Sequence, residues 1–186
     1  MQGTDRKKRL GNEGEALVRA WLIKQGYLIL PASLISGMGA PMLLGQKRII
    51  LPNNLTWRNG IQGWVEVKTK TTCSTHELKP KRDEHGIPLR HWIAYEMIQM
   101  QTQTPVSLAI LQLDIESIGL SLIDDLKSGE RIYPMDGEAH IFFNKEDFVW
   151  YKVQDLSMPE SIEPLAARTI KQLKQGTKEQ KQRKLF

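Results

Sequence analysis

The feature that most constrains the fold of this chain is a tight turn followed by a stretch of alternating side chains. The turn is Asn59-Gly60, which favours a two-residue hairpin because both residues tolerate a positive φ. From residue 62 to residue 70 apolar and polar side chains alternate, and this period of two predicts a strand with Val65 and Val67 facing the core. The opposite face then carries Trp64, Glu66 and Lys68. The strand therefore presents a carboxylate and an ammonium side by side from a rigid element.

Patterns on both sides of the hairpin predict further helices and strands. Apolar side chains at helical spacing predict helices over residues 13–25, 91–101 and 120–126. Asn12 would cap the first of these helices and Gly26 would end it. Strands are predicted over residues 27–30, 49–51, 106–113, 139–143 and 149–153, with a loop over 36–45 and an irregular stretch over 71–90. The order of these elements predicts an α/β sandwich that ends in a smaller α/β extension.

Length and composition exclude several classes of protein. The chain has 186 residues, of which 40% are hydrophobic, and this apolar content excludes a disordered chain. We expect one α/β domain over residues 1–157 and a basic, amphipathic C-terminal helix and tail over 158–186. The single cysteine, Cys73, excludes a disulfide framework and a thiolate zinc site, and a reducing cytoplasm is the expected location. No secretory signal and no apolar run of roughly 20 residues is visible, so no membrane span is expected.

Charge is distributed unevenly along the chain. Residues 1–92 carry 15 basic and 7 acidic side chains, residues 93–167 carry 4 and 13, and residues 168–186 carry 7 and 1. A face that binds a polyanion would therefore be built from the first and third parts and not from the middle. Charges that only decorate solvated faces would give the same counts, so charge alone does not separate these two interpretations.

Glu66 and Lys68 are the side chains best placed to carry chemistry. A carboxylate can bind a hard divalent cation such as Mg²⁺, and a lysine can orient a water or neutralise a phosphate. The alternative is an exposed ion pair on a half-buried strand, and the Glu-x-Lys pattern taken alone favours that alternative. Two further residues could lie near the pair. Asn53, at the predicted end of the preceding strand, would face Glu66 across the hairpin, and Glu15 could lean inward from the first helix or remain a surface acid near its start.

These elements together resemble the PD-(D/E)XK nuclease superfamily, and in particular its Holliday-junction-resolvase-like, phage-type and restriction-type branches. The resemblance rests on Gly11-Asn12-Glu13-Gly14-Glu15, on residues 26–30, on Pro52-Asn53 and on residues 64–70. It implies a restriction-endonuclease-like α-β-β-β-α-β core, with a mixed central sheet flanked by helices, within residues 1–157. It also implies Mg²⁺ or Mn²⁺ as cofactor and hydrolysis of phosphodiester bonds in DNA. Junction-cleaving members act as homodimers, so a homodimer is implied by analogy.

The resemblance also implies a role for each matching residue. Glu66 would be a metal ligand together with Asn53 and Val67, Lys68 would be the catalytic lysine, and Glu15 would be an auxiliary acid. Tyr95 and Gln99, four residues apart on the predicted helix, would support the site by contacting a phosphate or the lysine, although Tyr95 fits core packing better. His85 and His91 are expected in a solvated loop and at a helix end.

One position departs from the family pattern, because the proline-aspartate of the family is Pro52-Asn53 here. A neutral amide oxygen is a weaker ligand for Mg²⁺ than a carboxylate, and no acid occurs between Glu15 and Glu66 to replace it. Three hypotheses follow. Asn53 could be an engineered change that silences the enzyme, the chain could be a natural relative that binds DNA without cutting it, or Asn54, Glu15 or a distant acid could complete the site.

Basic residues lie on both sides of these candidate site residues in the sequence. The predicted DNA contacts are Lys7, Lys8, Arg9, Lys47, Arg48, Lys70, Lys81 and Arg82. The preferred hypothesis is a metal-dependent DNA endonuclease. The alternatives are a non-catalytic nucleic-acid-binding protein with the same fold and a partner-binding protein that uses the acidic middle segment.

Overall fold

The centre of the fold is a six-stranded mixed sheet, seen in a computed structural model that describes residues 2–36, 42–44, 47–75, 82–126, 131–135 and 137–153. Its strand order is β1-β4-β5-β8-β9-β12. The strands are β1 (Leu28–Pro31), β4 (Asn54–Arg58), β5 (Ile61–Lys70), β8 (Val106–Gln112), β9 (Ser117–Leu122) and β12 (Val149–Lys152). Strand β5 pairs in parallel with β8, and every other pair in this sheet is antiparallel.

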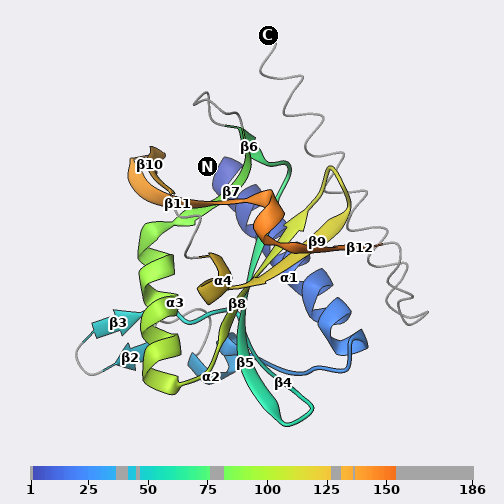
Figure 1. The fold of residues 1–186 in the computed structure, drawn as a ribbon, viewed down its shortest axis with the longest axis vertical. Coiled ribbons are helices and arrows are strands. Elements are labelled where there is room, and N and C mark those ends of the chain that lie inside the picture. The colour runs from blue at the N-terminus through green and yellow to red at the C-terminus, as the bar shows by residue number, and fades with distance from the viewer. Residues whose placement is uncertain are drawn as a thin grey trace.

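Two long helices lie on opposite faces of this sheet (Figure 1). Helix α1 (Gln2–Lys24) precedes β1, and helix α3 (Leu89–Thr102) connects β5 to β8 as the crossover that a parallel pair requires. The core order is therefore α1-β1-β4-β5-α3-β8, which is the predicted α-β-β-β-α-β arrangement. The predicted fold class is confirmed. Within the described ranges, no helix is long and apolar enough to cross a membrane.

A second sheet lies on the α3 side of the molecule, with strand order β10-β11-β7-β6. Its strands are β6 (Ser74–Thr75), β7 (Asp83–Pro88), β10 (Arg131–Met135) and β11 (Glu138–Asn144). Because β7 precedes α3 and β11 belongs to the C-terminal extension, this sheet joins the extension to the core. The smaller elements are α2 (Ala32–Ser36), the two-stranded sheet of β2 (Met42–Leu44) and β3 (Lys47–Ile49), α4 (Ile123–Leu126) and η2 (Lys145–Asp147).

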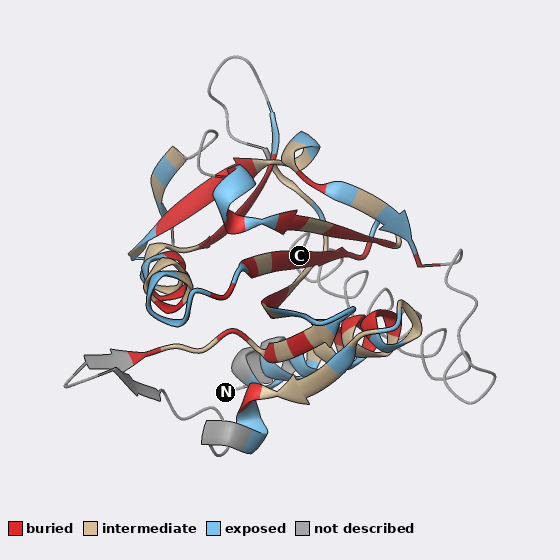
Figure 2. Ribbon diagram, turned by 60° about the horizontal axis from the view of Figure 1, so that its bottom comes forward, coloured by how far each residue is buried: buried red, intermediate tan, exposed pale blue. Residues whose placement is uncertain are grey.

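Two hydrophobic clusters hold the layers together, one on each face of the central sheet. On the α1 face, Val65 and Val67 pack with apolar side chains of the helix such as Val18 and Leu22. On the α3 face, apolar side chains of β8, α3, β7 and β11 form a single cluster. Figure 2 shows buried residues along the strands between these layers. The alternation predicted for β5 is therefore confirmed, because Val65 and Val67 pack in one cluster and Trp64 packs in the other.

The main correction concerns the hairpin partner of β5. Residues 49–51 were predicted to begin this partner and Pro52-Asn53 to end it, but Ile49 ends β3, which pairs with β2 instead. The true partner is β4, so Asn53 precedes the strand. Proline has no N–H to donate to a ladder, and Pro52 separates the two strands. The turn itself is as predicted, because Asn59 and Gly60 both have positive φ angles of 51° and 78°.

Other boundaries also differ from the predictions. Helix α1 begins at Gln2 and not after an Asn12 cap, because the charged residues before Gly11 continue the helix. Strand β2 lies within the predicted loop over 36–45, and β7 lies within the stretch predicted to be irregular. Residues 120–122 end β9, and only 123–126 are helical, because Ser117–Leu122 alternates. The predicted C-terminal helix and tail lie outside the described residues.

Candidate functional site

The pairing of β4 with β5 brings Asn53 to Glu66. Asn54 is the register partner of Val65, so Asn53 lies beside Glu66, one step further along. The backbone N–H of Asn53 donates to Glu66 Oε2 at 3.1 Å, and the backbone N–H of Val67 donates to Asn53 Oδ1 at 2.7 Å. Asn53 therefore contacts Glu66 and Val67, the two residues that were predicted to bind a metal together with it.

Lys68 forms an ion pair with the same carboxylate. Its Nζ lies 2.6 Å from Glu66 Oε1, and the two side chains are 23% and 4% exposed. Glu66 is therefore a buried charge whose two oxygens contact an ammonium and a backbone N–H, which is the compensation that burial of a carboxylate requires. The pair differs from the alternative of an exposed surface ion pair, because one of its members is buried.

Tyr95 reaches Glu66 from α3, the helix that covers this face of β5. This residue of α3 is fully buried, and its hydroxyl forms a hydrogen bond with Glu66. Burial, together with the charge of Glu66, raises the pKa of Tyr95 well above its usual value, so the hydroxyl stays protonated and donates a hydrogen bond to the carboxylate. The hydroxyl oxygen lies 3.2 Å from His91 Nδ1, and burial lowers the pKa of His91 to about 4. A neutral His91 that donates from Nδ1 completes this arrangement.

Glu15 is the remaining acid near the site. It lies on α1 and accepts a hydrogen bond from Arg19 at 2.7 Å. Burial raises the pKa of Glu15, the nearby Arg19 lowers it, and the charge of Glu66 raises it further. Glu15 therefore lies close enough to Glu66 for the two carboxylates to repel each other.

The predicted phosphate contacts have different environments. Lys8, Arg9 and Arg82 are exposed, and Arg9 lies 3.7 Å from Glu13. Lys70 instead turns inward and donates from Nζ to the Gly86 carbonyl at 2.7 Å, and burial, with the charge of Lys68, lowers its pKa to about 8. The side chains of Lys7, Lys47 and Arg48, and all of Lys81, lie outside the described residues.

Two residues considered for the site, Gln99 and Asn54, face other parts of the fold. Gln99 accepts from the Val106 N–H at 2.9 Å and donates to Asp124 at 2.8 Å. Asn54 shares the face of Val65, which is the α1 face, and its amide atoms are buried without a hydrogen-bond partner. The hypothesis that Asn54 completes the site is therefore wrong, because adjacent residues of a strand point to opposite faces.

His85 was also misassigned from the sequence. It lies on β7 with 1% of its surface exposed, and its Nε2 lies 3.1 Å from Gln112 Oε1 and 3.7 Å from Cys73 Sγ. Burial lowers the pKa of His85 to about 4 and raises the pKa of the Cys73 thiol. This neutral pair does not provide an activated thiolate nucleophile. The contact of Tyr95 with Glu66 and His91 was missed as well, and the four-residue spacing of His91 and Tyr95 on one helix was its only sequence signal.

The donors around Glu66 do not fit a magnesium ion as they stand. Mg²⁺ takes six oxygen ligands and favours carboxylates. Here Lys68 contacts one oxygen of the single buried carboxylate, and the Asn53 amide oxygen already accepts from Val67. Glu15 is paired with Arg19. No group of three or more His, Cys, Asp or Glu side chains in the described part of the chain could hold a metal ion. Asn53 offers a neutral amide oxygen, so no second carboxylate stands directly beside Glu66 across the β4–β5 pair.

Comparisons with known proteins find similar folds among solved structures. No family model matches the chain, and no curated protein matches it. Among solved structures, the chain is similar to Hjc of Archaeoglobus fulgidus, a Holliday junction resolvase from an archaeal hyperthermophile. The TM-score is 0.43 and the sequence identity is 8%, and the likeness covers 77% of this chain and 97% of that one.

Proposed function

We propose that this chain is a DNA-binding protein of the nuclease type, whose site is one carboxylate short of metal-dependent hydrolysis. The observation that supports this most strongly is the contact of Asn53 with Glu66 and Val67, beside the Lys68 ion pair. These are the positions that the resemblance assigned to the nuclease site, and they come together although Asn53 precedes Glu66 by 13 residues.

The residues of the site have distinct roles in this proposal. Lys68 is partly exposed, so its ammonium can neutralise a DNA phosphate at the site. Glu66 orients that ammonium, and Tyr95 of α3 holds the carboxylate by a hydrogen bond. The exposed Lys8, Arg9 and Arg82 extend the contact along the DNA backbone. Binding through such contacts weakens steeply with salt and reads little sequence.

A second candidate function is hydrolysis of DNA phosphodiester bonds with Mg²⁺ or Mn²⁺. The observation that favours it is the electrostatic coupling of Glu15 to Glu66 and Lys68. If Glu15 released the Arg19 guanidinium and bound a metal ion instead, it would supply the second carboxylate that position 53 lacks. A structured DNA such as a four-way junction, and a homodimer as the acting form, belong to this candidate.

The test compares the wild-type chain with Asn53→Asp on linear and four-way-junction DNA, each with Mn²⁺, Mg²⁺ or a chelator. We expect the wild type to bind DNA in the presence of chelator without cutting it, with an affinity that falls steeply between low and high salt. We expect Asn53→Asp to gain metal-dependent cleavage, and Asn53→Asp with Glu66→Gln to lose this gain while keeping the DNA affinity. The double variant is the matched control for a contaminating nuclease.

Each other outcome has a definite meaning. Metal-dependent cleavage by the wild type that Glu15→Gln abolishes favours the second candidate. An absence of DNA binding by the folded wild type contradicts both candidates and leaves the partner-binding hypothesis. DNA affinity that hardly changes with salt contradicts the assignment of the basic residues as phosphate contacts.

A further inference from the structure

The α1 face of the central sheet is only partly covered. Helix α1 packs against β1, β5 and β8, and its Trp21 ring lies 5.2 Å from the ring of Tyr151 on β12, but apolar side chains of β5, β9 and β12 on this face remain exposed. The exposed fractions are 70% for Ile61, 42% for Leu122, 61% for Val149 and 42% for Tyr151. Cross-strand partners share a face, and the registers place all four on the side of α1. We call these four side chains the open apolar face.

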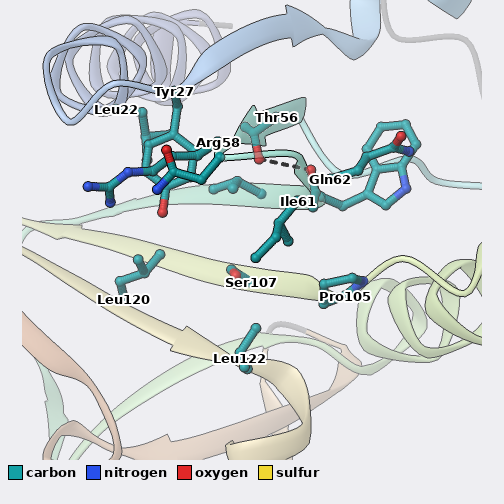
Figure 3. Close-up of a pocket in the computed structure, with 14 residues that line it drawn as sticks. Leu22, Tyr27, Thr56, Arg58, Ile61, Gln62, Pro105, Ser107, Leu120 and Leu122 are labelled. Carbon is teal, nitrogen blue, oxygen red and sulfur yellow. Dashed lines mark hydrogen bonds between the residues drawn. The ribbon is translucent and has the colours of Figure 1, made fainter.

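A cavity of about 260 Å³ adjoins the open apolar face. In Figure 3, Ile61 lies between Leu22 and Tyr27 on one side and Leu120 and Leu122 on the other. The polar residues that line the cavity include Arg58, whose guanidinium carbon lies 5.2 Å from the centroid of the Tyr27 ring. A mostly apolar hollow with few polar groups suits apolar side chains better than a charged ligand.

The chain itself supplies a segment with the matching pattern. Leu165, Ala166, Ile170 and Leu173 fall within an arc of roughly 140° on a helix of about 100° per residue. The basic residues of the same stretch, Arg168, Lys171 and Lys174, fall on the opposite side. A helix with this pattern needs an apolar surface for one face and solvent for the other.

The course of the chain brings this segment to the same place. The described part ends with β12, an edge strand that carries Val149 and Tyr151 of the open apolar face. The next residue, Val153, is buried in the α1-side cluster. Residues 154–162 separate it from the segment, and an extended stretch of this length spans up to roughly 30 Å. The segment can therefore reach every side chain of the open apolar face.

We propose that residues 163–175 dock as an amphipathic helix on the open apolar face, with Ile170 and Leu173 directed to the cavity beside Ile61. The short tether favours this occupant over a second copy, because an intramolecular partner has an effective concentration of order millimolar. Docking leaves the basic side chains exposed on the face of the sheet opposite to Glu66. The proposal is independent of the function of the Glu66 site.

Disulfide trapping in the full-length chain tests the docking. In a Cys73→Ser background, the pair Leu122→Cys and Ile170→Cys should form an intramolecular disulfide at least about tenfold faster than two matched pairs. In the first matched pair Lys171→Cys, on the opposite side of the segment, replaces Ile170→Cys. In the second, Met100→Cys, which is exposed on α3, replaces Leu122→Cys. The first matched pair shares both the tether and Leu122→Cys with the test pair, so chain flexibility alone would give these two pairs similar rates.

Two results of the disulfide experiment would overturn the proposal. Equal rates in the three pairs would mean that the segment has no preferred position, and disulfides that form only between molecules would assign the open apolar face to a second copy. Hydrogen exchange on the unmodified full-length chain provides a measurement that does not depend on the cysteine variants. Amides of residues 163–175 should be protected, and Leu122→Lys should remove this protection while β8 stays protected. Unprotected amides in the folded wild type would also contradict docking.

Discussion

Two glycines three residues apart on α1 should respond differently to substitution by alanine. At Gly11, a Cβ atom would meet nothing within 4 Å, whereas at Gly14 it would overlap Thr69 Oγ1 and lie 3.0 Å from Thr69 Cβ. In a helix interior alanine is favoured over glycine by about 1 kcal/mol, and this gain applies to both positions. Overpacking at Gly14 costs about 1–3 kcal/mol, because Thr69 belongs to β5 and cannot easily move.

We therefore expect Gly11→Ala to raise the free energy of unfolding by about 1 kcal/mol. The free energy of unfolding of Gly14→Ala should be about 1–3 kcal/mol lower than that of Gly11→Ala. Urea unfolding of the two variants measures this difference. Thr69→Ala removes the overlapping hydroxyl, so combined with Gly14→Ala it should recover most of the loss in a double-mutant cycle. If Gly14→Ala stabilised the chain as much as Gly11→Ala, the close approach of α1 to β5 that positions Glu15 would be wrong.

Three further predictions concern the α3 side of the fold. Gly86→Ala should destabilise the chain by about 1–3 kcal/mol in thermal or urea unfolding, because its Cβ would lie 2.7 Å from atoms of the Phe142 ring, and an unchanged stability would contradict the pairing of β7 with β11. His85 has a pKa of about 4 in the fold and about 6.5 when unfolded, so stability should fall as the pH drops from 6.5 toward 4, by up to about 3 kcal/mol from this residue. His85→Gln should reduce that acid sensitivity, and an unaltered pH profile would refute the assignment. Tyr95→Phe should lower the free energy of unfolding by about 1–3 kcal/mol, because it removes a donor from the buried Glu66 carboxylate, and a neutral result would mean that the hydrogen bond is absent.

The core of the site could be predicted from the sequence because it depends on local patterns. The period of two places Glu66 and Lys68 on one face of β5, and the Asn59-Gly60 turn brings the preceding strand back beside them. The prediction that Asn53 faces Glu66 succeeded although the strand was placed wrongly. A hairpin fixes which residues lie opposite each other from the turn outward, whatever strand boundaries are assumed.

The rest of the site depends on contacts between segments far apart in the sequence. The sequence of strand β7 predicts a polar, irregular stretch because it contains Glu84, His85 and Gly86. These residues are buried because β7 pairs with β11. Such tertiary pairing overrides local propensity. The contact of Tyr95 with Glu66 likewise depends on how α3 packs against the sheet, which the spacing of apolar residues does not determine.

The affinity for Mn²⁺ tests the central claim most directly, because it reports the donor set at Glu66 without requiring turnover. Titration with Mn²⁺, followed by electron paramagnetic resonance, should show weak binding to the wild type. Binding should be at least about tenfold tighter for Asn53→Asp, since the new carboxylate lies beside Glu66. Adding Glu66→Gln should reverse the gain. Wild-type binding as tight as that of Asn53→Asp would contradict the claim that this site lacks one carboxylate.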